Sequence, residues 1–313
     1  MLSILNTSIE HILGKPEERY FGNGFRFFTI NIEDLELLPN RIQGQAIVKY
    51  NGPLRPHGDA PHVGSIEFMA FSLRICTYAI NRLIRINIAD TNRAFLRNYS
   101  IQIYNSLAIG THNFTCKLLS TSPDTSSLQG YISQIEIQFE NNVKIKVTID
   151  HRGYSTHRSL PENEIIDINL DQLHSHGYKS TEINFCPLEI NLDTRTIATE
   201  IFYKHFLEEN TFIGLGSARN NLLPTDAFRI YGQLMQAYLY QLYNYDRNIC
   251  QNIWLRKMHM TQERPYFKEK IKASVFFEDI RTITLDGTVW KLIKLNGCVG
   301  NYIGSFQVAH KDF

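Results

Sequence analysis

The sequence predicts an α+β fold in which two similar halves each wrap an antiparallel sheet around a long apolar helix. One observation is a segment that occurs twice: an extended run, a polar break, a proline and then a long apolar helix with an acid near its start. Arg41 to Tyr50 and His57 to Arg85 form the first copy, and Asp193 to Lys204 and Ser217 to Tyr243 form the second. The other observation is that extended runs follow each helix, which is the order of an α+β domain.

The repeat divides the chain into two halves. Pro61 and Pro224 hold matching positions about half a chain length apart, which favours a duplication over a solenoid with its periods of roughly 20 to 50 residues. Aligning the two prolines gives almost no identity, so the repeat is one of pattern. We expect one half at residues 1–155, a polar linker at 156–187 and a second half at 188–313.

The first half begins with an amphipathic helix and a loop within residues 1–29. Arg26 to Leu38 and Arg41 to Tyr50 are predicted strands, and the apolar positions after Pro61 keep a helical face. Gly130 to Asp150 is the clearest hairpin, because apolar residues alternate on both sides of a pair of asparagines.

The second half repeats this order. Its helix is followed by extended runs at Lys270–Phe277, Arg281–Leu285, Val289–Leu295 and Tyr302–Ala309. A helix followed by several antiparallel strands, twice over, is the order of a double hotdog, in which each sheet wraps a central helix. Such a helix must be apolar nearly all round, and both candidate helices are.

Composition narrows the class of partner. The 313 residues are 43% hydrophobic and 20% charged with a net charge of +1, so nothing favours a nucleic acid or an anionic membrane as partner. No run approaches the roughly 18 apolar residues of a membrane helix, and the first residues lack the pattern of a signal peptide. The five scattered cysteines, with no CxxC pair, indicate reduced thiols and no structural zinc. We therefore expect a cytoplasmic protein, and leave open whether it is a homodimer.

Polar residues gather where the first helix begins. His57, Asp59 and His62 precede it, and we expect His57 and Asp59 to bind substrate. A histidine at a helix start is kept neutral by the helix dipole, which suits His62 as a base; a structural histidine is the alternative.

Glu67 is an acid within the apolar stretch IEFMAF. Burying a carboxylate costs several kcal/mol unless it is paired or neutral, and such a group suits general acid or base catalysis. The alternative is that Glu67 pairs with an arginine such as Arg26 or Arg74. We expect Glu67 and His62 to be catalytic.

The second helix begins with a different set. Asp226 is the third predicted catalytic residue, although a first-turn acid that satisfies free amides would explain it equally well. Arg219, Asn220 and Gln233 would bind substrate, because cationic and amide groups suit a phosphate or a carbonyl oxygen. No P-loop, GxSxG or HExxH motif is present, and the two histidines of His151–His157 lack further ligands. No metal and no cofactor is predicted.

The residues around both prolines resemble known families. Pro61 followed six residues later by Glu67 resembles hotdog dehydratases, although His62 stands where that family has glycine. Over most of the chain, LGKPEERYFGNGF, RPHGDAPHVGSIEFMA and ARNNLLPTDAFRIYGQLMQ resemble the AvrD family of bacterial avirulence proteins. That family is implicated in making syringolide-type signals, and it is similar to the synthases of γ-butyrolactone autoregulators.

The resemblance implies a biosynthetic enzyme of secondary metabolism that condenses a β-ketoacyl thioester, carried on CoA or an acyl carrier protein, with a small ketosugar or polyol. The product would be an acyl glycoside or lactone signal. A hydroxyacyl-thioester dehydratase or thioesterase on the same fold is one alternative. A non-catalytic protein that binds an acyl signal is another.

Overall fold

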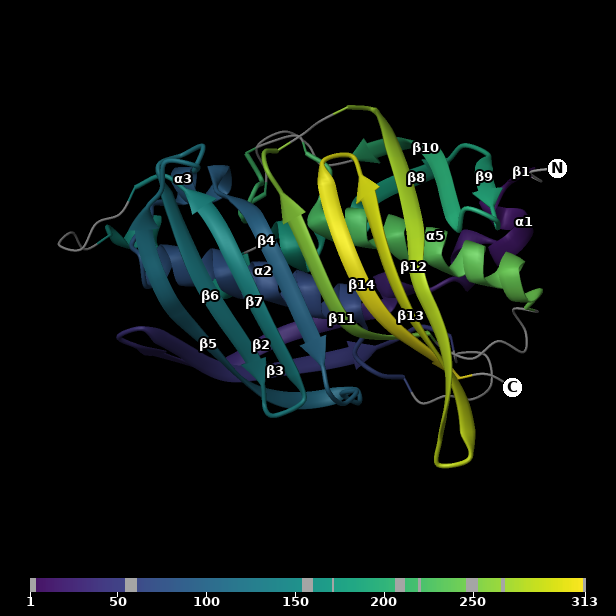
Figure 1. Ribbon diagram of the computed structural model, residues 1–313. Coiled ribbons are helices and arrows are strands. Elements are labelled where there is room, and N and C mark those ends of the chain that lie inside the picture. The colour runs from purple at the N-terminus through teal and green to yellow at the C-terminus, as the bar shows by residue number, and fades with distance from the viewer. Residues whose placement is uncertain are drawn as a thin grey trace.

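Two long helices lie against one broad antiparallel sheet in the computed structural model of the chain (Figure 1). The structure describes residues 4–53, 61–153, 160–170, 172–205, 212–218, 221–245, 253–265 and 268–311. Strands β4 to β7 cover α2, and strands β11 to β14 cover α5. The α+β class, with a mostly antiparallel sheet, is as expected from the sequence.

The N-terminal half contains two helices and six strands among its described residues. They are β2 (Phe28–Leu38), β3 (Arg41–Tyr50), α2 (Ser65–Arg82), α3 (Ile88–Arg93), β4 (Phe95–Ile103), β5 (Gly110–Pro123), β6 (Tyr131–Phe139) and β7 (Val143–His151). The predicted hairpin is β6–β7, paired from Tyr131–His151 to Phe139–Val143.

The C-terminal half is built around α5 and includes the start of the chain. Its elements are β1 (Ile4–Thr7), α1 (Ile9–Leu13), β8 (Thr181–Phe185), β9 (Leu188–Asn191), β10 (Thr196–His205), α5 (Pro224–Tyr243), β11 (Ile253–Gln262), β12 (Lys270–Leu285), β13 (Thr288–Val299) and β14 (Tyr302–Lys311). The short helix α4 (Gln172–Ser175) packs on α2 of the N-terminal half. Short 3₁₀ turns lie at Pro16–Glu18, Gly24–Phe27, Glu162–Glu164, Ile168–Leu170 and Gly177–Ser180.

Both long helices are buried almost all round. In α2, 15 of 18 residues are buried, and in α5, 14 of 20. A helix with polar residues on one face would leave that face in water, so this burial requires the nearly continuous apolar character that the sequence shows. The same burial encloses Glu67 and Asp226, each in the first turn of its helix.

The strands form one sheet where we expected two. The described strands follow the order β1-β9-β10-β12-β13-β14-β11-β4-β7-β6-β5-β3-β2, and β8 pairs with β10. The halves join where β11 pairs with β4, from Lys257–Gln102 to Thr261–Asn98. The sequence analysis missed both joining strands. Each carries a bulge, at Leu96–Asn98 in β4 and at Leu255–Lys257 in β11, which interrupts the alternation that marks a strand.

The boundaries of the halves also differ from the expected ones. Residues 4–13 were assigned to the first half, but β1 pairs with β9 and α1 packs on α5. The predicted linker 156–187 contains strand β8 and buried side chains such as Ile168 and Tyr178. Arg74 on α2 donates hydrogen bonds to the carbonyls of Ile168 and Ile30, which fixes this segment against the first half.

Candidate functional site

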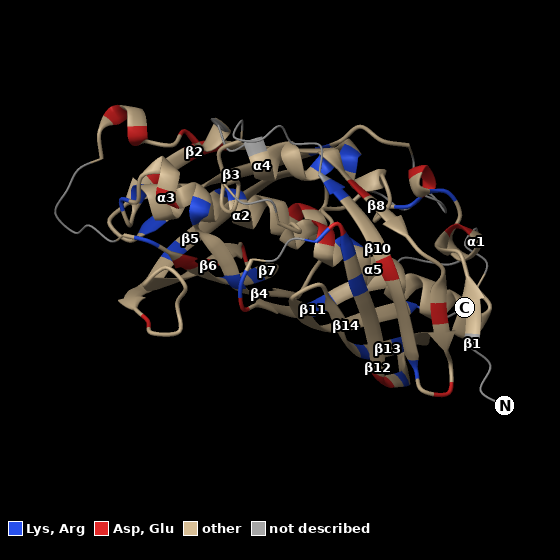
Figure 2. Cartoon of the chain, turned by 90° about the horizontal axis from the view of Figure 1, so that it is seen from above, with Lys and Arg blue, Asp and Glu red and all other residues tan. Residues whose placement is uncertain are grey.

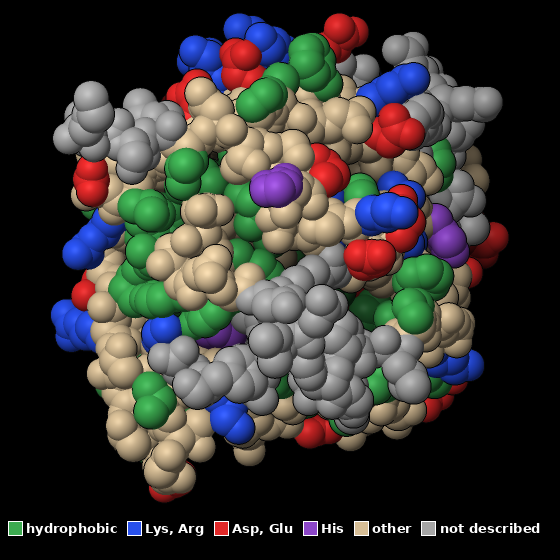
Figure 3. All heavy atoms as spheres, turned by 90° about the vertical axis from the view of Figure 1, so that its right-hand side faces the viewer, with side chains coloured by type: hydrophobic (Ala, Val, Ile, Leu, Met, Phe, Trp, Pro, Cys, Tyr) green, Lys and Arg blue, Asp and Glu red, His purple; other side chains and the backbone are tan. Residues whose placement is uncertain are grey.

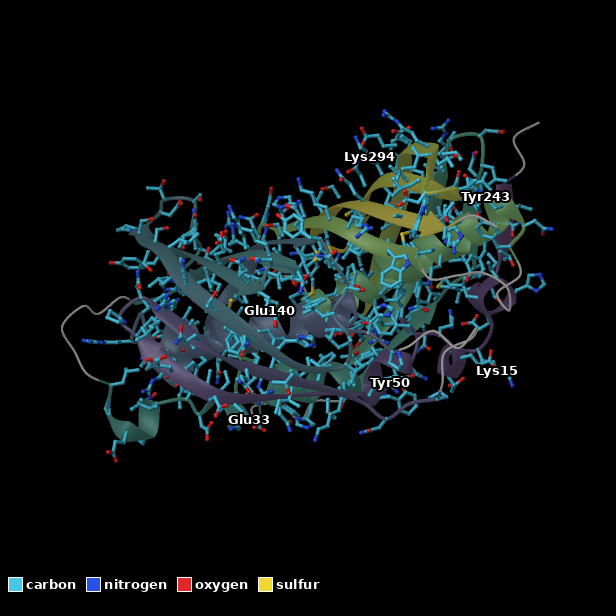
Figure 4. All side chains as sticks on the ribbon, turned by 90° about the horizontal axis from the view of Figure 1, so that it is seen from below. Lys15, Glu33, Tyr50, Glu140, Tyr243 and Lys294 are labelled. Atoms are coloured by element: carbon cyan, nitrogen blue, oxygen red, sulfur yellow. The ribbon has the colours of Figure 1, made fainter. Side chains whose placement is uncertain are left out.

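A cavity of about 440 Å³ lies where the two halves meet. Most of its walls come from the segment from Leu13 to Phe27, the start of α2, and one face of α5 with strands β11 and β14, and the ends of β3 and β4 contribute further residues. Most of the lining is apolar; it includes Phe21, Phe68, Phe228, Met235, Leu255, Phe306 and Val308. Tyr50 also lines the cavity. In Figure 4 it lies between Glu33, on the N-terminal half, and Lys15, at the end of the molecule that carries α1.

His62 lines this cavity, but it is not at a helix start as predicted. It lies three residues ahead of Ser65, in a β-bridge with Ala108, while Gly64 is the N-cap of α2. The imidazole ring stacks on the indole of Trp254, with 4.6 Å between ring centroids. Trp254 also lines the cavity. Because His62 belongs to the N-terminal half and Trp254 to the C-terminal half, this aromatic pair joins the two halves at the cavity.

Glu67 is connected to the cavity through Tyr20. The Glu67 side chain is fully buried and does not belong to the cavity lining, whereas Tyr20 does. The Tyr20 hydroxyl donates a short hydrogen bond to Oε2 of Glu67 and accepts one from the backbone N–H of Ile66 at 3.3 Å. Arg74, one of the arginines considered as a partner of Glu67, donates hydrogen bonds to Ile168, Ile30 and Asn169.

Gly64 makes the contact between Tyr20 and Glu67 sterically possible. A Cβ at residue 64 would lie 2.0 Å from the Tyr20 hydroxyl and 2.4 Å from Oε2 of Glu67. The backbone of Gly64, at φ −86° and ψ 170°, is open to any residue, so the glycine is required for space rather than for conformation.

The charge of Glu67 influences the pKa of two further ionisable groups. Burial lowers the pKa of Lys179, and the Glu67 carboxylate partly opposes that effect. Burial raises the pKa of Tyr178 well above its usual value, and Glu67 raises it further. The Lys179 ammonium donates to the carbonyl of Phe28, so it also ties the Gly177–Ser180 turn to β2.

Asp226 lies in a buried ion pair and is not part of the cavity lining. Its Oδ1 accepts hydrogen bonds from Arg229, at 2.6 Å, and from the Thr181 hydroxyl, and its Oδ2 accepts from the Tyr203 hydroxyl. Arg229 in turn donates to the backbone carbonyls of Phe21 and Gly22. Through this pair α5 holds the segment that forms one cavity wall.

The predicted substrate-binding residues fall into two groups. His57, Asp59, Arg219 and Asn220 lie outside the described residues. Gln233 is buried within α5 and does not line the cavity, whereas Gln236, one turn further on, does. The helix turns Gln236 toward the face that also carries Gly232 and Met235.

Among the lining residues that the sequence analysis did not single out are Arg19, Tyr20 and Trp254. Arg19 and Tyr20 lie in the KPEERYFGNGF segment, where three charged residues in a row precede two aromatic ones. The charged run directly before an aromatic pair was the available signal, and in the structure the Arg19 side chain is only 4% exposed. Trp254 gave no signal because its partner His62 is distant in sequence.

Charged residues of both signs are spread over the molecule. Basic and acidic residues are interspersed over the strands and loops in Figure 2. No described helix is long and apolar enough to span a membrane. Within the described ranges, no group of three or more His, Cys, Asp or Glu side chains is placed to hold a metal ion.

A protein-family model matches nearly the whole chain. The model of the Pseudomonas avirulence D protein (AvrD) matches residues 4–312. The chain belongs to the AvrD family. This match confirms the resemblance drawn from the segments around Tyr20, Pro61 and Pro224. A comparison with curated protein sequences finds no match.

Solved structures similar to this AvrD-family chain share little sequence with it. The tesB protein of Mycobacterium avium subspecies paratuberculosis is 7% identical, with a TM-score of 0.44 over 98% of this chain and 100% of that one. A conserved protein of Mycobacterium tuberculosis, described as a double hotdog fold, is 8% identical, with a TM-score of 0.42 over 81% and 83%. The dehydratase domain from the CurJ module of curacin polyketide synthase is 11% identical, with a TM-score of 0.39 over 90% and 96%.

Proposed function

We propose that this AvrD-family protein is a cytoplasmic biosynthetic enzyme that condenses a β-ketoacyl thioester with a small ketosugar or polyol. The observation that supports the proposal most is the cavity between the halves. Its volume of about 440 Å³ lies within the range of roughly 300 to 1,000 Å³ that is usual for small-molecule sites. Its lining is mostly apolar and has polar groups near the start of α2, as an acyl chain with a polar head requires.

The acyl chain would lie along α5. Phe228, Tyr231 and Met235 offer apolar surface on this helix, and Phe306 and Val308 face them from β14. Burying hydrocarbon stabilises binding by about 25 cal/mol per Å² of apolar surface removed from water. The reacting carbonyls would then lie beside Gly64 and Ser65, where the first amides of α2 can donate to an oxygen that gains negative charge.

His62 would act as the base for ester formation. The sugar hydroxyl oxygen attacks the thioester carbon, the hydroxyl proton moves to the imidazole, the new C–O bond forms and the C–S bond breaks. The thiolate leaves and takes up a proton. Stacking on Trp254 holds the ring in one plane, which fixes the direction in which its nitrogens can act.

The test is turnover with purified protein, a β-ketoacyl thioester of N-acetylcysteamine and a panel of ketosugars and polyols. Thiol release that depends on the sugar, with an ester or lactone seen by mass spectrometry, is the expected result. Release of thiol without sugar would indicate a thioesterase, loss of water from a hydroxyacyl thioester would indicate a dehydratase, and tight binding without turnover would indicate a carrier or sensor.

A matched pair of histidine variants locates the base. Loss of a general base costs roughly 10² to 10⁴ in rate, which we expect for kcat of His62→Ala. His259→Ala is the control, because His259 is exposed on β11 and does not line the cavity. Equal rates for the two variants would remove His62 from the mechanism.

A further inference from the structure

The hydrogen bonds at the start of α2 join a tyrosine that lines the cavity to a carboxylate that does not line it. Tyr20 donates to Oε2 of Glu67 while its oxygen accepts from the N–H of Ile66. Glu67 is fully buried, next to a second, small cavity of about 10 Å³ with apolar walls that include Val48 and Phe71. Tyr20 therefore connects the buried carboxylate to the main cavity through one hydrogen bond.

We propose that Tyr20 and Glu67 form a proton relay that removes a proton from the carbon between the two carbonyls of a β-ketoacyl substrate. The Tyr20 oxygen takes the proton from carbon as the Tyr20 proton moves to Oε2 of Glu67. The electron pair of the broken C–H bond stays on the substrate as an enolate, and Glu67 becomes a neutral acid. The assignment rests on the proposed function and names the group that activates carbon, separate from His62.

The surroundings of the relay favour this direction of transfer. Burying a carboxylate charge in apolar surroundings costs free energy, and taking up a proton removes that cost. The Ile66 amide and the N-terminus of α2, an 18-residue helix, stabilise negative charge on the Tyr20 oxygen while the proton moves. The partial positive charge at the helix start therefore lies beside the atom that reacts.

Gly64 leaves the start of α2 without a side-chain cap. Ser, Asp or Asn at an N-cap accepts a hydrogen bond from a free amide of the first turn, whereas Gly64, the N-cap of α2, has no side chain to do so. Any side chain at residue 64 would collide with the Tyr20 hydroxyl and with Oε2 of Glu67. The absent cap is explained if the Tyr20–Glu67 bond has a function.

The experiment measures carbon acidity without requiring turnover. The probe is a β-diketone in which a methylene group replaces the thioester sulfur, so that it cannot be cleaved. In D₂O, exchange of the protons between its carbonyls is followed by NMR. We expect the wild-type protein to accelerate exchange, and Tyr20→Phe to lose roughly 10²-fold or more of that acceleration while still binding the probe.

Further variants separate a relay from a structural role. Glu67→Gln keeps an oxygen that can accept from Tyr20 but takes up no proton, so it should fold and should lose exchange as Tyr20→Phe does. The double variant should be no slower than either single one, because the two residues act as a unit. Tyr302→Phe is the control: it removes a buried tyrosine hydroxyl, bonded to the Leu222 carbonyl, that does not line the cavity.

The outcomes distinguish the relay from the condensation. Wild-type exchange no faster than that of Tyr20→Phe, or full exchange in Glu67→Gln, would overturn the relay. Exchange that depends on both residues, in a protein that releases no thiol from β-ketoacyl thioesters, would support the relay and overturn the proposed condensation.

Discussion

Two buried carboxylates in equivalent helix turns have different partners, and the partners decide what each can do. Glu67 is bonded to a tyrosine that faces the cavity, so a proton can pass between them. Asp226 has both oxygens engaged, by Arg229, Thr181 and Tyr203. Arg229 lies only three residues after Asp226, whereas Tyr20 is 47 residues away from Glu67, so the partner of Glu67 could not be read from the sequence pattern.

The Asp226–Arg229 pair is expected to stabilise the fold strongly. Arg229→Met leaves the buried Asp226 charge without its ion partner, which costs about 3 to 5 kcal/mol. Urea unfolding measures this loss. The double variant Arg229→Met with Asp226→Leu should recover part of it, because no charge then stays buried alone. A single variant as stable as the wild-type protein would contradict this role.

His151 is expected to make stability depend on pH. Burial lowers the pKa of His151, whose Nε2 lies 2.7 Å from the hydroxyl of the buried Ser133. The unfolded chain, with a histidine pKa near 6.5, therefore binds the proton at a higher pH than the folded chain. Stability should fall as pH drops below about 6.5 and level off below the folded pKa. His151→Gln should show a smaller fall in midpoint temperature between pH 7.5 and 5.5; an unchanged fall would contradict the assignment.

At the scale of elements, α5 provides one wall of the cavity and is shaped for it. Gly232 lies in the middle of this helix, where glycine costs about 1 kcal/mol relative to alanine. A Cβ there would lie 2.7 Å from two ring atoms of Phe21, which lines the cavity. The glycine therefore lets the N-terminal segment approach α5 closely.

Gly232→Ala should consequently destabilise the protein, although helix propensity alone predicts a gain of about 1 kcal/mol. The Phe21 ring must move, and binding of the β-diketone probe should weaken with it. Denaturant unfolding and titration of the probe measure the two effects. Adding Phe21→Leu should relieve the clash and restore part of the stability, and a stabilised single variant would show that the contact is not tight.

A second feature at the scale of elements is the surface at the end of the molecule near α1 and the last turns of α5. Hydrophobic side chains gather on this end in Figure 3. Among the described residues, the long β12–β13 hairpin also exposes Leu285 and Leu292 near its tip. The outer positions of β12 alternate with buried ones until the hairpin leaves the body of the sheet.

At the scale of the whole molecule, the sequence predicted individual helices and hairpins better than the contacts that join the two halves. Helices α2 and α5 and the hairpin β6–β7 could be predicted, because continuous apolar character and strict alternation are local signals. Strands β4 and β11 could not, because their bulges break the period. Tyr20 and Glu67 lie 47 residues apart, so no spacing rule brings them together. The residues missed are those whose role depends on contact between distant segments.

The connection between the halves predicts that they unfold together. The β4–β11 pairing carries five residue pairs in continuous register, residues 4–13 pack on the C-terminal half, and side chains of both halves share one cavity. Opening either half alone would expose the apolar surfaces of that cavity and the edge of a strand that is otherwise paired.

Native-state hydrogen exchange tests this directly. The most protected amides of β6–β7, in one half, and of β13–β14, in the other, should open with the same free energy, equal to that of global unfolding. Calorimetry should show one transition whose calorimetric and van't Hoff enthalpies agree. Two distinct opening free energies would mean that the halves are separate folding units, and that the cavity between them can open while both stay folded.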